Sequence, residues 1–271
     1  MSEMYPEQSL LAFVRDGLET LRTNRFSYTR LGILEEFGRV LHALMDVALP
    51  PTPEEGKKTK ERKGGDKPEG TLNDRAAAVV RLLGSEAGAA VATLLGDDET
   101  NLVVHLMTLV GMDVQPGGDS GLYAEPVSDD ETLAALHVVE GCLLLAESAK
   151  DDLTGFLPVL VALVSGIRGP VVAEAAITTL SASLVGSRTN IEVVLGTHIG
   201  QELKAALVDG NASLRARSDI LYLFRILAAE GQAAVNALSE ILGASQTQAL
   251  LGLSLQAPDR AKIAALLLTM S

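Results

Sequence analysis

Metal binding and acid–base catalysis often use histidine, and this chain of 271 residues contains four. Two histidines that share a metal on one helix lie three or four residues apart. No two of the four have that spacing, since they are His42, His105, His137 and His198. We therefore predict no metal site, and we interpret His105, which lies in an apolar stretch, as a partly buried structural residue.

Sequence signatures of common active sites are also missing. The chain has no phosphate-binding Gly-x-x-x-x-Gly-Lys loop, no Gly-x-Ser-x-Gly elbow and no calcium-binding EF-hand spacing. Its acidic clusters are typical of helix starts, where carboxylates interact with free N–H groups: Asp97-Asp98-Glu99, Asp129-Asp130-Glu131 and Asp151-Asp152. We predict that the protein is not an enzyme and holds no cofactor.

Composition and charge restrict the class of partner. Hydrophobic residues make up 47 % of the chain and aromatic residues 3 %, so Leu, Ala and Val must form most of the core. The formal net charge is −13, and nearly all of it follows residue 72. An acidic body repels phosphate groups, so we expect a protein partner rather than nucleic acid or a membrane. The oligomeric state does not follow from the sequence.

The sequence contains no recognisable targeting segment. The start of the chain lacks the apolar core of a signal peptide. Apolar runs such as residues 156–164 are far shorter than the roughly 20 residues that cross a bilayer. The single cysteine, Cys142, lies in an apolar stretch and is interpreted as inert core packing. We therefore expect a soluble, cytoplasmic protein.

Apolar periodicity predicts an almost entirely helical chain. Apolar residues recur at spacings of three and four in two helices within residues 7–49, with a polar break at 23–28. The sequence Pro50-Pro51-Thr52-Pro53 ends the second helix, and the charge-rich stretch after it has almost no apolar side chain. We predict N-terminal helices (1–49), a disordered charged linker (50–72) whose targeting role stays open, and a helical domain (73–271).

Several helices are expected at the start of the 73–271 domain. Short helices are predicted at 75–83, 86–95 and 100–110, followed by a loop at 113–126 that is rich in glycine and proline. Ser128, with Glu131 three residues later, forms the pattern of a capping box, and this box opens a long helix that continues to Leu145.

The strongest pattern in this domain is an internal repeat. Ala162-Leu163-Val164-x-Gly166 overlays Ala206-Leu207-Val208-x-Gly210 at a shift of 44 residues. Each glycine precedes a longer helix, predicted at 170–185 and 214–229, and each longer helix precedes a short one. At the same shift the apolar positions of the longer helices coincide: Ala176 with Ile220, Ile177 with Leu221, and Leu180 with Phe224.

A unit of about 40–47 residues that runs short, medium and long helix resembles the armadillo family. The resemblance covers residues 130–242 most clearly and is carried by Leu157-Pro158-x-Leu160-x-x-Leu163-Val164 and Ala175-Ala176-x-x-x-Leu180-Ser181-x-x-Leu184. It implies an all-α, right-handed helical solenoid preceded by an N-terminal helical pair. HEAT-type repeats and an irregular helical bundle are the alternatives.

One departure from the family limits the functions that it implies. Nuclear-import adaptors of this family grip peptides with Trp and Asn residues on the third helix. Here the third helix reads Thr178-Thr179-Leu180-Ser181-Ala182, without either residue. An import-receptor function is therefore not expected.

Third helices of such a solenoid line one surface, where we expect the partner to bind. On the helix at 214–229, the core face would hold Ala216, Ile220, Leu223, Phe224 and Leu227. Ser218, Tyr222 and Arg225 share another face, and exposed Tyr and Arg are typical binding anchors. Overlay of the two preceding long helices extends the predicted partner-binding set to Glu174, Thr178, Ser181, His137 and Glu140. The alternative is an ordinary solvated helix face.

These features predict a non-enzymatic protein-binding scaffold or adaptor that uses the concave face of the solenoid. A second interpretation is a regulator of a molecular machine, because small armadillo proteins include nucleotide-exchange factors for heat-shock chaperones. A third is a structural subunit of a cytoskeletal or ciliary assembly.

Overall fold

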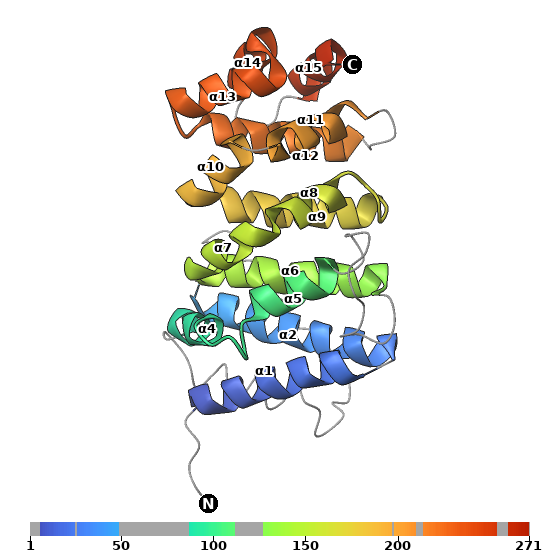
Figure 1. The fold of residues 1–271 in the computed structure, drawn as a ribbon, viewed down its shortest axis with the longest axis vertical. Helices are drawn as coiled ribbons and strands as arrows, with labels where there is room; N and C mark the ends of the chain where they lie inside the picture. Colours follow the sequence, from blue (N-terminus) through green and yellow to red (C-terminus); the bar gives the residue numbers. More distant parts are fainter. Residues whose placement is uncertain are drawn as a thin grey trace, which may run out of the picture.

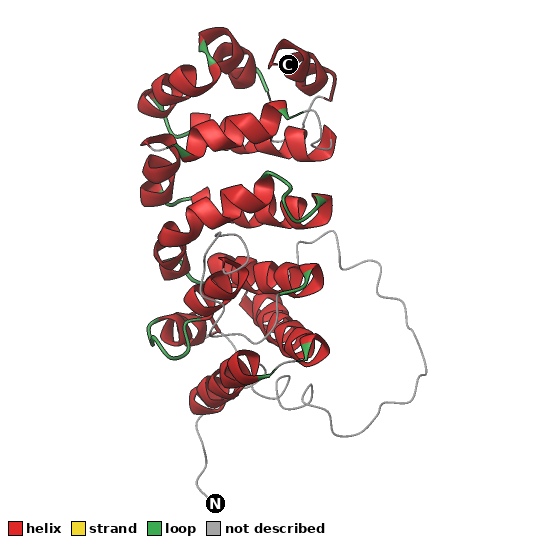
Figure 2. Ribbon diagram, turned by 45° about the vertical axis from the view of Figure 1, so that its right-hand side comes forward, coloured by secondary structure: helices red, strands yellow, loops and turns green. Residues whose placement is uncertain are grey.

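The computed structural model describes residues 6–24, 26–48, 87–111, 127–196, 198–209, 214–253 and 260–270. Within these ranges all regular structure is helical, and no strand is present (Figure 2). The predicted linker at 50–72, the predicted helix at 75–83 and the predicted loop at 113–126 lie outside the described residues.

Most predicted helices are confirmed to within a few residues. The helices are α1 (Pro6–Thr23), α2 (Ser27–Ala48), α4 (Ala87–Leu95), α5 (Leu102–Gly111), α6 (Asp129–Leu145), α7 (Ser148–Leu153), the 3-10 turn η4 (Thr154–Phe156), α8 (Leu157–Val164), α9 (Pro170–Leu184), α10 (Arg188–Gly196), α11 (Ile199–Val208), α12 (Leu214–Ala228), α13 (Gln232–Leu242), α14 (Ala244–Leu251) and α15 (Arg260–Met270).

The helices are stacked in layers along the longest axis, with α1 at one end and α14 and α15 at the other (Figure 1). Long helices contact one another from layer to layer: α2 packs on α6, α6 on α9, and α9 on α12. We call these four the long-helix row. A second row of contacts joins α5, α8 and α11, and a third joins α4, α7, α10 and α13.

The helices α2 and α6 run in the same direction. Near their starts, the Ser27 and Ser128 hydroxyl oxygens lie 3.4 Å apart. Roughly four helical turns further along, a Cβ placed on Gly141 would lie 3.3 Å from the Cβ of Leu41. The two helices therefore keep one register over most of the length of α6, although about 100 residues separate them in the chain.

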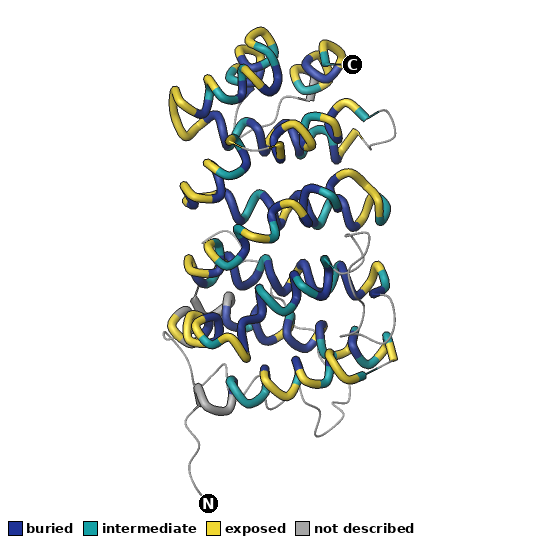
Figure 3. The backbone as a smooth tube through the Cα atoms, viewed as in Figure 1, coloured by how far each residue is buried: buried dark blue, intermediate teal, exposed yellow. Residues whose placement is uncertain are grey.

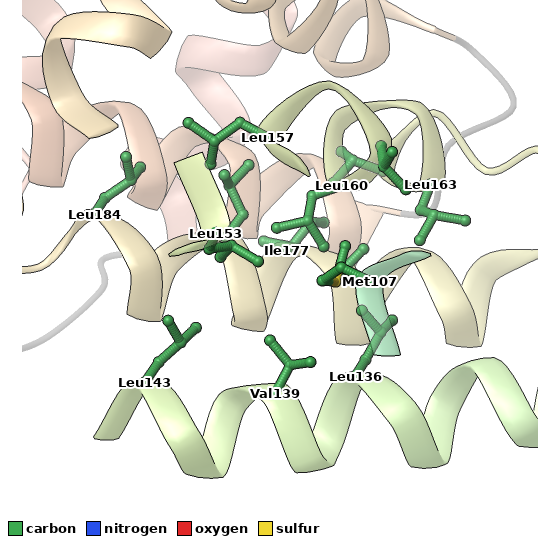
Figure 4. Close-up of a cluster of buried hydrophobic side chains, with 14 of the residues drawn as sticks. Met107, Leu136, Val139, Leu143, Leu153, Leu157, Leu160, Leu163, Ile177 and Leu184 are labelled. Carbon is green, nitrogen blue, oxygen red and sulfur yellow. The ribbon is translucent and has the colours of Figure 1, made fainter. Parts of the chain in front are cut away.

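Buried Leu, Val and Ala side chains form one cluster that extends from Leu10 on α1 to Leu267 on α15. Figure 3 shows the buried positions concentrated along the middle of the long helices. Figure 4 shows side chains from neighbouring layers meeting in this cluster, among them Met107 of α5, Leu136 of α6 and Ile177 of α9. The core is made largely of aliphatic side chains, as the composition predicts.

The predicted core face of α12 is confirmed. Ala216, Ile220, Leu223, Phe224 and Leu227 are all buried, with Phe224 fully enclosed. Leu180, the position that overlays Phe224 at the shift of 44 residues, is also fully enclosed. The internal repeat therefore aligns positions that have the same environment in α9 and α12.

Local signals set several helix boundaries. The Ser128 hydroxyl accepts a hydrogen bond from the Glu131 N–H, and the Glu131 carboxylate accepts one from the Ser128 N–H, which confirms the capping box. Gly169 has a φ of 90°, a conformation that favours glycine, and Pro170 follows in the first turn of α9.

Within the described residues, no single helix has both the length and the apolar composition to span a membrane. The pair α9 and α10, bent by 120°, meets those two criteria jointly.

Candidate functional site

The structure places every predicted partner-binding residue outside the core, on three neighbouring members of the long-helix row. His137 and Glu140 lie on α6, and Glu174, Thr178 and Ser181 lie on α9. Ser218, Tyr222 and Arg225 lie on α12. His137, Thr178 and Tyr222 are exposed, and the other five are partly buried.

Charged side chains connect the N-terminal halves of α9 and α12. Arg215 lies 3.4 Å from the Glu174 carboxylate, measured from Nη1 to Oε2. Asp219 stands one turn further along α12. Partial burial raises the pKa of its carboxyl group; Arg215 acts in the opposite direction, and Glu174 raises the pKa further. Arg215 therefore pairs with Glu174 at this point on the row, and both of these charges act on the nearby Asp219 carboxyl group.

Tyr222 and Arg225 differ in their roles. Tyr222 has 38 % of its surface exposed, which suits a contact residue. The Arg225 Nε donates a hydrogen bond of 2.9 Å to the carbonyl oxygen of Leu253, so the guanidinium ties α12 to the turn after α14. Arg225 therefore has a structural role in addition to the binding role that the sequence predicts.

The hydroxyl groups of two predicted residues bond to their own helices. Thr178 Oγ1 donates to the Glu174 carbonyl oxygen at 3.0 Å, and Ser218 Oγ donates to the Leu214 carbonyl oxygen at 2.7 Å. Since each hydroxyl proton is already used, these two side chains can offer a partner only acceptor oxygens and apolar atoms.

A groove of about 540 Å³ lies between α2 and α6. We call it the α2–α6 groove. It takes in two residues of the predicted site, His137 and Glu140. The remaining lining residues come from α6 (Ala134, Gly141, Leu144) and from α2 (Leu34, Glu35, Gly38, Arg39, Leu41, His42).

Two glycines shape this groove. A Cβ on Gly141 would lie 3.3 Å from two carbon atoms of Leu41, and a Cβ on Gly38 would lie 3.9 Å from a Val138 methyl group. The absence of a side chain at Gly141 lets α2 and α6 approach closely, whereas a Cβ at Gly38 would make an ordinary van der Waals contact. Both glycines line the groove, so a larger side chain at either position would take up some of its space.

The groove has an uneven distribution of charge. Arg39 donates to the Glu36 carboxylate at 2.6 Å and to the Glu35 carboxylate at 3.3 Å. Burial raises the pKa of the Glu140 carboxyl group, and His137 is the neighbour that acts to lower it. The Glu140 carboxyl group is therefore partly shielded from water, and among the described residues it has no Arg or Lys as an ion-pair partner.

Sequence reasoning missed the α2 side of the groove. The apolar positions Leu34, Phe37, Leu41 and Leu44 do leave Glu35, Arg39 and His42 on the opposite side of the predicted helix. That pattern shows which residues of α2 face outward. It does not show that α2 lies beside α6, so it could not indicate a shared groove.

The acidic clusters and the other residues considered for chemistry have structural partners. Arg15 pairs with Glu99 at 3.2 Å and Arg168 with Asp129 at 3.0 Å. Asn101 Nδ2 donates to Asp152 Oδ2 at 3.0 Å. His105 is partly buried, as predicted, and burial lowers its pKa, with the Arg22 charge acting in the same direction.

Within the described residues, no group of three or more His, Cys, Asp and Glu side chains is arranged to hold a metal ion. Cys142 is buried, and burial raises the pKa of its thiol to about 12.

Comparison of the chain with protein-family models, with curated proteins and with solved structures returned no match.

Proposed function

We propose that this protein is a non-enzymatic scaffold or adaptor that binds another protein across the outward side of the long-helix row. We also propose that the stack is an armadillo-like solenoid. The order of α7, α8 and α9, repeated by α10, α11 and α12 as short, medium and long helices, supports this arrangement.

One observation carries the functional proposal: four long helices that pack in sequence present partly exposed side chains, and the row is hollowed between α2 and α6. Leu144 lies in that hollow with 55 % of its surface exposed. A hollow that contains an uncovered apolar side chain is a common feature of protein-binding surfaces. We propose a protein partner because the net charge of −13 disfavours polyanions.

The proposal is tested with one variant on α12 and one on α6, where the groove lies. The full chain serves as bait, captured proteins are identified by mass spectrometry, and affinity for the purified partner is then titrated. Tyr222→Ala on α12 and Leu144→Asp on α6 are compared with the chain that carries neither change. Truncation of an anchor residue costs about 2 kcal/mol, which is roughly thirtyfold in affinity.

Gln201→Ala on α11 and Gln248→Ala on α14 are the matched controls, because both glutamines are exposed and lie on helices outside the long-helix row. We expect a loss of affinity with at least one row variant and none with the controls, at unchanged melting temperature. A partner that binds both row variants normally, yet loses affinity with a control, would place the binding surface elsewhere. Arg225 is left intact because its truncation would also disturb the turn at Leu253.

A further inference from the structure

The α2–α6 groove is a trough that follows two helices over several turns. Its lining extends from Leu34 to His42 on α2 and from Ala134 to Leu144 on α6. At 1.5 Å per residue, the second stretch corresponds to about 15 Å of helix. Because α2 and α6 run in the same direction, the trough is parallel to both, which is the geometry that receives an added helix.

The apolar part of the groove is only partly covered. Leu34 and Leu41 have 0 % and 3 % of their surfaces exposed, so the core already uses them. Leu144, at the C-terminal end of the trough on α6, has 55 % exposed. An apolar side chain that covered Leu144 would remove further apolar area from water, which is favourable in proportion to that area.

The charged part of the groove favours a cation. Arg39 is already held by Glu35 and Glu36. Glu140 is one turn before Leu144 and is partly buried. Among the described residues, the charged neighbour that acts on its carboxyl group is His137 and not an Arg or Lys. A hydrogen-bonded Lys or Arg stabilises a partly buried carboxylate more than an exposed one, because the protein screens the attraction between the two charges less than water does.

We propose that the α2–α6 groove binds an amphipathic helix of a partner protein, whose apolar side chains cover Leu144 and whose Lys or Arg pairs with Glu140. This inference rests on the proposed function, because it assigns a chemistry to the partner at one end of the long-helix row. Apolar anchors three and four residues apart on the bound helix fit the trough, and a basic residue on the same helix reaches its edge.

Charge argues for this occupant over two others. A second copy of the chain also carries a net charge of −13, so the two copies repel each other. An anionic membrane surface is repelled for the same reason. A basic helix is attracted, and its association rate falls as the salt concentration rises.

The probe is a displayed library of random 14-residue peptides, selected on the full chain. The two most enriched peptides are synthesised with a fluorescent label and titrated by anisotropy, each beside a version in which every Lys and Arg is replaced by Glu. We expect apolar residues at helical spacing together with Lys or Arg, and binding at least tenfold weaker for the Glu versions.

The groove is tested with Glu140→Gln and Leu144→Asp. Glu240→Gln is the control, because Glu240 is exposed and lies on α13, outside the groove. We expect each groove variant to bind the selected peptides about tenfold more weakly, and the control to bind as well as the original chain. Failure to enrich any peptide, enrichment of acidic peptides, or equal affinity in the groove variants would overturn the proposal.

Two further measurements separate this inference from the proposed function. If selected peptides lose affinity with Tyr222→Ala and keep it with Glu140→Gln, the groove assignment fails while binding on the row stands. Sedimentation velocity across a range of concentrations tests for a second copy. A dimer that Leu144→Asp abolishes would assign the groove to self-association and overturn the partner helix.

Discussion

Arg30 of α2 and Glu131 of α6 form a fully buried ion pair, with 2.6 Å between the arginine Nε and the glutamate Oε1. The Oε2 atom of the same carboxylate accepts a hydrogen bond of 2.7 Å from the Ser128 N–H. Glu131 therefore has two structural roles, since it completes the cap of α6 and holds α2 in register beside it.

We expect the chain to tolerate loss of the whole pair better than loss of its cation alone. Arg30→Met leaves a buried carboxylate without its cation, which costs about 3–5 kcal/mol of unfolding free energy. Adding Glu131→Gln removes the stranded charge and keeps a side chain that can complete the capping box. Urea unfolding should therefore show the double variant as more stable than Arg30→Met. A double variant that is less stable than Arg30→Met would contradict this account.

Stability should depend on pH through Glu131. Burial acts to raise the pKa of this carboxyl group, but hydrogen bonds from Arg30, Ser128 and Ser27 outweigh it, so the pKa in the folded state lies below its usual value. The pair therefore stabilises the fold above the unfolded-state pKa of about 4.3, and this contribution is lost as the pH falls through the lower folded pKa.

The measurement is the difference in unfolding free energy between the original chain and Glu131→Gln at several pH values from 7 to 3. Using a difference removes the contribution of the other carboxylates. We expect a large difference at pH 7 that shrinks below about pH 4.3. A difference that stays constant over this range would show that the Glu131 charge does not stabilise the fold.

Two glycines should respond to alanine in opposite directions. A Cβ on Gly200, in the first turn of α11, would lie 2.6 Å from the Ile241 Cδ1 and 3.0 Å from the Val194 carbonyl oxygen. Gly200→Ala should therefore destabilise the fold by about 1–3 kcal/mol. A Cβ placed on Gly32, inside α2, would point into open space, with no atom of a neighbouring element within 4 Å. Gly32→Ala should therefore stabilise the fold by about 0.5–1 kcal/mol.

Thermal melting of these two variants, with the original chain measured in parallel, gives the sign of each effect. If Gly200→Ala melts at the same temperature as the original chain, α11 and α13 do not approach each other as closely as the structure shows.

Cys142 should be unreactive in the folded protein. Its side chain is fully buried, and its thiol has a pKa of about 12, so almost no thiolate is present at pH 8. A chromogenic disulfide reagent at pH 8 should therefore react very slowly with the native chain and quickly after unfolding in guanidinium. Rapid reaction of the native chain would mean that α6 opens far more readily than its packing indicates.

Features that depend on neighbouring residues could be predicted from the sequence. The capping box of Ser128 and Glu131 involves positions three residues apart, and the apolar spacing of α12 places Ile220 and Phe224 on one side of a helix. Such patterns are local because the helix repeats every 3.6 residues, so each side chain's direction follows from its position along the helix. The outward positions of Tyr222 and His137 follow from the same rule.

The relation of α2 to α6 could not be predicted in this way. Apolar stripes of Leu, Val and Ala attract one another without direction, so many pairings of helices bury similar area. Nothing near Arg30 in the chain indicates that its partner is Glu131, since opposite charges are common throughout the sequence. Likewise, Gly38 and Gly141 form a groove only after their helices are adjacent. The pairing of α2 with α6 is selected because this packing of the whole chain buries Arg30 beside a carboxylate and leaves few voids. Both conditions are properties of the complete fold and not of any single segment.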